Sequence, residues 1–142
     1  MEARRLLTKF AMSQPKARIL IVDDDPMLTE MYSFILTMGD EFEVHVENRA
    51  GGALKTALEF KPDLILLDRN MPELSGAEVA AELRLAGLLN VKIAFLTGVG
   101  GPHPGTFEGL PSFPKPKRGE ELASIVRNLL GAPCRFASLV RK

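Results

Sequence analysis

The chain has 142 residues, of which 46% are apolar and 25% charged, and its 18 basic and 18 acidic side chains cancel. That length suits one globular domain. The balanced charge excludes a strongly basic nucleic-acid-binding protein and an acidic disordered chain. A single cysteine, Cys134, excludes a disulfide framework or a multi-cysteine metal site. No apolar run reaches the roughly 18 residues of a membrane span and no leader pattern opens the chain, so we expect a cytoplasmic protein with no membrane contact.

The chain is expected to hold one folded domain, residues 17–131, between two short ends. Residues 1–16 have the composition of a flexible N-terminal extension, and residues 132–142 that of a short C-terminal tail. Translation from Met12 instead of Met1 is left open as an alternative.

The first elements are a strand, a helix and a second strand. Residues 19–22 form a short β-branched apolar run without alternation, which is typical of a strand buried on both faces. Asp25 followed by Pro26 has the form of an N-cap and a first helical position, and Gly39 ends that helix. Residues 42–47 alternate apolar and polar side chains, which predicts an edge strand with one wet face.

The middle of the chain repeats this order. A second helix is expected to end near residues 61–62, before a second buried strand at 64–67 that stops at Asp68. Residues 71–76 then make a turn, and a third helix runs to Gly87.

The last third is less regular. A third buried strand at 93–96 ends at Thr97. Residues 98–112 contain five glycines and three prolines, a composition that a helix does not tolerate. Residues 113–116 predict at most a brief strand, and an apolar stripe over 122–129 predicts the final helix.

Strands that alternate with helices predict a doubly wound α/β fold, with a mainly parallel sheet covered by helices on both faces. Ligands of such sheets bind at the carboxyl ends of the strands. The polar residues expected at that edge are Asp23, Asp24, Asp68, Thr97 and Lys115.

This set of side chains suits phosphoryl chemistry. Three neighbouring carboxylates repel one another unless a cation joins them, and all-oxygen ligands suit Mg²⁺ or Mn²⁺. A metal beside a lysine and a hydroxyl can hold the oxygens of a phosphoryl group, and a carboxylate can accept that group as a nucleophile.

At these residues the chain resembles the receiver domain of a two-component response regulator, of the single-domain, chemotaxis-regulator-like kind. The resemblance covers about residues 17–131 and rests on five elements in the right order on the right strands. The matching stretches are residues 19–26, 63–72, Gly76, 95–98 and 113–116.

The resemblance implies a role for each site residue. Asp68 is the phosphoryl acceptor, and Thr97 and Lys115 are the groups that hold the phosphoryl oxygens. Gly76 lies where the family turns tightly behind the acceptor loop. The implied ligands of Mg²⁺ or Mn²⁺ are Asp23, Asp24, Asp68 and the backbone carbonyl of Asn70.

The implied fold is flavodoxin-like, with a five-stranded parallel sheet in the order 2-1-3-4-5. Because of the composition of residues 98–112, we expect the fourth helix of the family to be degenerate or missing. Ser112 stands three residues before Lys115, where the family typically carries an aromatic residue, so the usual coupling of Thr97 to an aromatic side chain is not supported here.

The implied function is Mg²⁺-dependent phosphorylation of Asp68 by a sensor histidine kinase or phosphotransfer protein. Signalling then passes through an unidentified downstream protein, without direct nucleic-acid binding and without enzymatic turnover beyond self-catalysed phosphorylation and dephosphorylation. Two alternatives stay open: a phosphohydrolase of the haloacid-dehalogenase type with Asp23 as nucleophile, and a pseudo-receiver that binds partners without phosphorylation.

Overall fold

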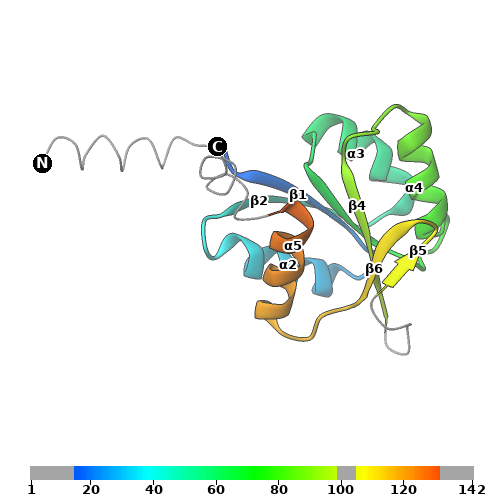
Figure 1. Cartoon of the computed structure of the whole chain (residues 1–142). Helices are drawn as coiled ribbons and strands as arrows, with labels where there is room; N and C mark the ends of the chain where they lie inside the picture. Colours follow the sequence, from blue (N-terminus) through cyan, green and yellow to red (C-terminus); the bar gives the residue numbers. More distant parts are fainter. Residues whose placement is uncertain (1–14, 99–104, 132–142) are drawn as a thin grey trace, which may run out of the picture.

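The computed structural model describes residues 15–98 and 105–131, which build one six-stranded sheet flanked by helices (Figure 1). The strand order is β2-β1-β3-β4-β6-β5, parallel throughout except for β5. The strands are β1 (Ala17–Val22), β2 (Phe42–Glu47), β3 (Leu64–Asp68), β4 (Lys92–Thr97), β5 (Gly105–Phe107) and β6 (Leu110–Pro114). The helices are α2 (Pro26–Thr37), the 3-10 turn η1 (Ala50–Gly52), α3 (Ala53–Phe60), α4 (Gly76–Leu85) and α5 (Gly119–Leu130).

The helix boundaries follow from local chemistry. The Asp25 side chain accepts hydrogen bonds from the first-turn amides of α2, which confirms the predicted N-cap before Pro26. Ser75 and Glu78 form a reciprocal capping box at the start of α4. Gly131 takes a left-handed conformation after α5, as a helix-ending glycine commonly does.

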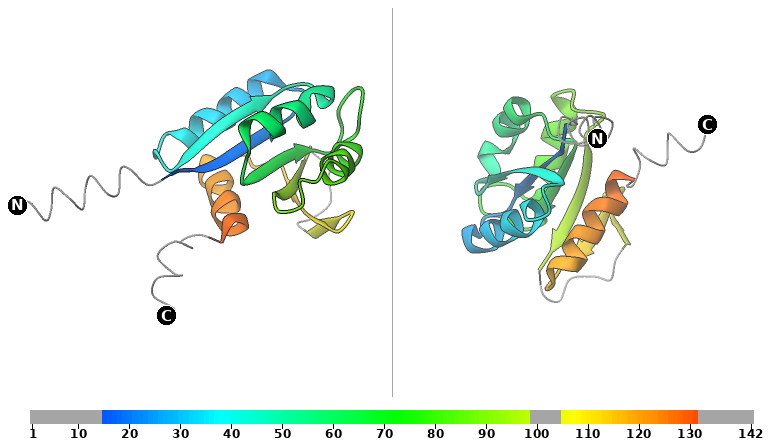
Figure 2. Two further views of the ribbon diagram at one scale, coloured as in Figure 1. Left: turned by 90° about the horizontal axis from the view of Figure 1, so that it is seen from above. Right: turned by 90° about the vertical axis from the view of Figure 1, so that its left-hand side faces the viewer.

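The sheet separates two apolar cores. Helices α2 and α5 cover one face and α3 and α4 cover the other, as the two orientations of Figure 2 show. Strands β1 and β3 contribute alternate residues to both cores, which is why their sequences are continuously apolar. Strand β2 lies at one edge and keeps one half-exposed face, as its alternating sequence predicts.

Two expectations about the last third of the sheet were wrong. The sheet has six strands, not five, because Gly105–Phe107 pair antiparallel with β6. Glu108 and Gly109 both have positive φ, 53° and 77°, so they form a two-residue turn with the twist that hairpins favour. Strand β6 is also a regular five-residue strand where a brief one was expected.

The expected loss of the fourth helix is consistent with this hairpin. The described residues between β4 and β6 contain β5 and its turn but no helix, while residues 99–104 lie outside the described part. Most of the predicted N-terminal extension and the whole C-terminal tail with Cys134 also lie outside it. The two proposed translation starts fall in the same undescribed stretch.

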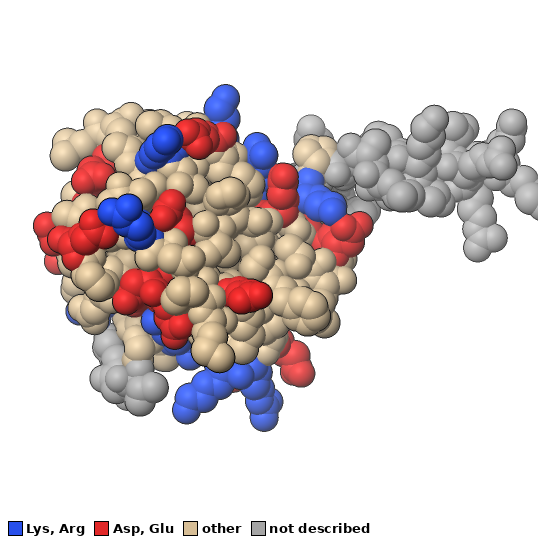
Figure 3. Space-filling model, turned by 180° about the vertical axis from the view of Figure 1, so that it is seen from behind, with Lys and Arg blue, Asp and Glu red and all other residues tan. Residues whose placement is uncertain are grey.

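Within the described ranges, no helix combines the length and the apolar character that crossing a membrane requires. On the face seen in Figure 3, acidic and basic side chains are interspersed among wide areas of other residues.

Candidate functional site

The parallel strands bring the predicted acidic residues together at one edge of the sheet. The register pairs Val22 with Leu67, so Asp23 follows β1 directly beside Asp68 at the end of β3. Carboxylate oxygens of Asp23, Asp24 and Asp68 all lie within 4.8 Å of one another. Asp23 and Asp68 are buried, whereas Asp24 is exposed, so the cluster opens to solvent on one side.

Lys115 reaches this cluster from β6. Thr97 pairs with Pro114 across β4 and β6, and the Lys115 amide donates to the Thr97 carbonyl at 2.7 Å, which fixes where the lysine begins. Its Nζ lies 2.8 Å from Asp23 Oδ2 and 3.5 Å from Asp68 Oδ1. One ammonium against three carboxylates leaves negative charge in the cluster, which suits a divalent cation.

The environment of Asp68 disfavours its charged form. Burial, followed by repulsion from Asp23, raises the pKa of Asp68 to about 6, against the lowering effects of Lys115 and the Asn70 amide. That amide donates to Asp68 Oδ1 at 3.4 Å. Burial alone would lower the pKa of Lys115, but its bonds to Asp23 and Asp68 outweigh burial and raise it. Carboxylates that repel one another in this way bind a cation readily, because the positive charge offsets their repulsion.

Thr97 lies at the same edge but does not contact the carboxylates in this structure. It is buried at the end of β4, and its hydroxyl donates to the Phe113 carbonyl at 3.4 Å.

Two residues that support the site were not found from the sequence. Tyr32 of α2 donates its hydroxyl to the Pro116 carbonyl at 2.9 Å and so holds the segment that follows Lys115. Asn48 donates to the Asp23 carbonyl and to Thr29 Oγ1, both at 2.9 Å. Tyr32 carries a signal in retrospect, since it is the only tyrosine and lies on the buried side of α2. Asn48 follows an edge strand, and nothing in the sequence around it indicates a supporting role.

Gly76 packs directly behind Asp68. A Cβ atom added at Gly76 would lie 2.3 Å from the Asp68 carbonyl oxygen and 3.0 Å from the Arg69 Cα. The Gly76 amide donates to the Arg69 carbonyl at 2.8 Å. Because Gly76 has no side chain, the start of α4 packs directly against the backbone of Asp68 and Arg69. This contact fixes the position of the end of β3.

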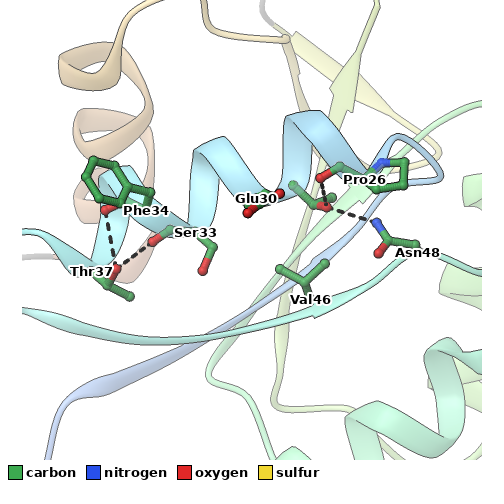
Figure 4. Close-up of a pocket in the computed structure, with 8 residues that line it drawn as sticks. Pro26, Glu30, Ser33, Phe34, Thr37, Val46 and Asn48 are labelled. Atoms are coloured by element: carbon green, nitrogen blue, oxygen red, sulfur yellow. Dashed lines mark hydrogen bonds between the residues drawn. The ribbon is translucent and has the colours of Figure 1, made fainter.

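A groove of about 500 Å³ runs between α2 and β2, next to the acidic cluster but separate from it (Figure 4). Pro26 and Asn48 stand at the end near the cluster, and Phe34 and Thr37 stand at the other. The outer surface of α2 beside this groove is apolar. Its exposed side chains at helical spacing are Met27, Met31, Phe34 and Met38.

The model of the response regulator receiver domain matches residues 19–104 of the chain. The chain is a receiver domain of this family. Receiver domains are generally not enzymes.

Relatives with curated names are response regulators. The receiver domain is 41% identical over 73 residues to the DNA-binding response regulator MtrA of Mycolicibacterium smegmatis, a match that covers 51% of this chain and 32% of MtrA. It is 34% identical over 85 residues to the nitrate/nitrite response regulator protein homolog of Haemophilus influenzae, covering 59% and 40% of the two chains. The chain therefore spans less than half the length of these relatives.

Solved structures agree on the fold. The receiver domain of the response regulator NarL from Mycobacterium tuberculosis superimposes with a TM-score of 0.71 at 24% identity, covering 84% of this chain and 99% of that one. A response regulator from Chloroflexus aurantiacus gives 0.69 at 26% identity, covering 82% and 99%. These likenesses bear out the flavodoxin-like α/β fold, with the sixth strand as the difference.

Proposed function

We propose that the protein is a phosphoryl-accepting receiver domain in which Asp68 is the acceptor. The proposal rests on the position of Asp68 in a receiver fold. Its buried carboxylate lies within 4.8 Å of those of Asp23 and Asp24 and 3.5 Å from the Lys115 ammonium. An oxygen of the Asp68 carboxylate attacks the phosphorus of the donor. The bond from phosphorus to the donor atom breaks, and the donor leaves with that electron pair.

The donor set of the cluster fits Mg²⁺ or Mn²⁺, because its ligands are hard oxygens and their mutual repulsion needs a cation. The ligands would be Asp23, Asp24, Asp68 and the Asn70 carbonyl. When bound, the ion neutralises charge on the transferred phosphoryl group. Lys115 then gives up part of its pairing with Asp23 to bind a phosphoryl oxygen, and the Thr97 hydroxyl leaves the Phe113 carbonyl to donate to another.

Receiver domains interact with histidine kinases or phosphotransfer proteins, and we infer that such a donor docks here on α2. The exposed stripe of Met27, Met31, Phe34 and Met38 starts two residues after the capping Asp25, so it is continuous with the acidic cluster. Phe34 is 68% exposed and borders the groove of Figure 4. An exposed apolar stripe on one helix suits the apolar face of a partner helix. Such an exchange would take place in the cytoplasm.

The acceptor is tested by intact mass after incubation with acetyl phosphate and Mg²⁺. Wild type is expected to gain one phosphoryl group, and Asp68→Asn to gain none, because the nucleophilic oxygen is gone. Asp23→Asn is expected to be phosphorylated more slowly than wild type, because it keeps Asp68 but loses an ion ligand. An adduct that persists in Asp68→Asn and disappears in Asp23→Asn would support the phosphohydrolase alternative. If neither acetyl phosphate nor beryllofluoride binds wild type, the pseudo-receiver alternative holds.

The docking surface is tested by comparing two donors. In Phe34→Ala, phosphotransfer from any histidine phosphotransfer protein that labels wild type is expected to fall on the order of tenfold or more, because an aromatic anchor that the partner would bury is lost. Phosphorylation by acetyl phosphate is expected to stay unchanged, since Phe34 does not contact the cluster. The matched control is Leu85→Ala, which removes an even more exposed apolar side chain at the end of α4. Equal loss with both donors would contradict docking on α2.

A further inference from the structure

The residue that follows the proposed acceptor is an arginine whose side chain lies on an aromatic ring. The Arg69 Cζ is 3.6 Å from the centroid of the Phe107 ring. Within the described residues, no carboxylate lies at ion-pair distance from the Arg69 guanidinium. Arg69 therefore follows Asp68 in the chain but, within the described residues, forms no ion pair with the acidic cluster.

Phe107 is the side chain that attaches β5 to the rest of the domain. Its ring meets the buried Phe95 ring of β4 edge-on, with centroids 5.2 Å apart and planes at 77°. Strand β5 pairs only with β6 and lies at the edge of the sheet, as Figure 1 shows. Arg69 thus stacks on a ring that also packs against the core.

The strand beneath this contact carries an unsatisfied polar group. Ser112 of β6 pairs with Phe95 on one side and with Gly105 of β5 on the other. Ser112 is 2% exposed, and among the described residues its hydroxyl has no hydrogen-bond partner. A buried unpaired hydroxyl weakens the packing around it, so the β5–β6 hairpin is held less firmly than the central strands.

A phosphoryl group on Asp68 would compete with the ring for this cation. Arg69 lies just beyond the last residue of β3, and its long, flexible side chain can turn from the ring toward Asp68. Charge-assisted hydrogen bonds from a guanidinium to phosphate are roughly twice as strong as neutral ones, whereas Phe107 is only half-buried, which keeps its attraction for a cation modest.

We propose that Arg69 is a second cationic ligand of the phosphoryl group, and that by binding it Arg69 leaves Phe107 and loosens the β5–β6 hairpin. This inference rests on the proposed function, since it needs a phosphoryl group on Asp68. Phosphorylation would then change the conformation of β5 without needing an aromatic side chain at position 112. Arg69 links the phosphorylation state of Asp68 to the packing of the Phe107 ring.

The hairpin is tested by amide hydrogen exchange of the full chain with Mg²⁺, with and without beryllofluoride as the phosphoryl analogue. In wild type, exchange over residues 105–112 is expected to become about fivefold to tenfold faster with beryllofluoride, while β1 and β3 stay protected. In Arg69→Gln the hairpin is expected to exchange at one rate in both conditions. Arg127→Gln, which removes a surface arginine paired with Glu41, is the control and is expected to respond as wild type does.

Analogue affinity distinguishes a ligand from a structural contact. Arg69→Gln is expected to weaken beryllofluoride binding about fivefold, because a cation is lost. Phe107→Leu is expected to strengthen it severalfold, because the cation is freed from the ring. If both variants shift the affinity in the same direction, or if hairpin exchange does not respond to bound analogue in wild type, the inference is overturned. Fluorine NMR reports binding itself, so a sample that binds no analogue contradicts the proposed function instead.

Discussion

Methionine in place of Lys115 is expected to destabilise the metal-free protein by about 3 kcal/mol at pH 7.5, because two buried carboxylates lose the cation between them. It is also expected to slow phosphorylation by acetyl phosphate roughly 100-fold, as the loss of a charge aimed at the transferred group does in other active sites. Methionine keeps the length and apolar stem of the lysine, so the change is mainly electrostatic.

The stability loss in Lys115→Met is expected to depend on pH. The folded-state pKa of Asp68 is about 6, above the ordinary value of 3.8, so the folded protein binds this proton more tightly than the unfolded chain does. The cost of the charged Asp68 is therefore full above about pH 6 and disappears as the pH falls toward 4. Lys115 lowers that pKa, and removing it shifts the window upward.

Chemical denaturation of both proteins in the presence of a chelator, at pH 7.5 and pH 5, measures this dependence. The gap between wild type and Lys115→Met should narrow at pH 5, where Asp68 carries a proton in the variant. Lys117→Met, at an exposed position two residues on, should match wild type at both values. A gap of equal size at the two pH values would mean that Lys115 contributes packing, not charge compensation.

Alanine in place of Gly76 is expected to have the largest effect on the position of the acceptor. Its Cβ would lie 2.3 Å from the Asp68 carbonyl oxygen, a separation that no relaxed structure keeps, so β3 or the start of α4 must move. Overpacking of this kind costs about 1–3 kcal/mol, and a displaced nucleophile commonly loses a factor of roughly 100 in rate.

Thermal unfolding and the rate of phosphorylation by acetyl phosphate measure the two effects of Gly76→Ala. Gly39→Ala is the matched control, because a Cβ there meets nothing within 4 Å. It is expected to leave both measurements unchanged. Wild-type stability together with a wild-type rate in Gly76→Ala would show that the loop behind Asp68 adapts freely.

The sequence predicted the central strands and the site because both depend on local patterns. Runs such as 19–22 and 64–67 are apolar at every position, which only strands buried on both faces require. The acidic residues follow those runs directly, so a parallel sheet brings them to one edge. Asp25 was correctly separated from the cluster, because its place before Pro26 marks an N-cap.

The hairpin could not be read from the sequence. Residues 98–112 are rich in glycine and proline, which excludes a helix but does not say what replaces it. Strand β5 has three residues, too few for a periodic pattern, and it is held by the Glu108-Gly109 turn and by Phe107 against Phe95. Those contacts join residues from different strands, so their stability depends on tertiary packing.

The sequence by itself determined the α/β fold class and the strand ends that carry the acidic residues, because both are encoded in local hydrophobic runs. The strand order, the predicted acceptor and the predicted ion ligands came from the resemblance to receiver domains. Only the tertiary structure decided how these residues are supported. Tyr32 holds the segment after Lys115, Gly76 sets the end of β3, and Arg69 lies on Phe107. Each of these contacts joins residues of different elements or loops and depends on how those elements pack, which hydrophobic periodicity does not specify.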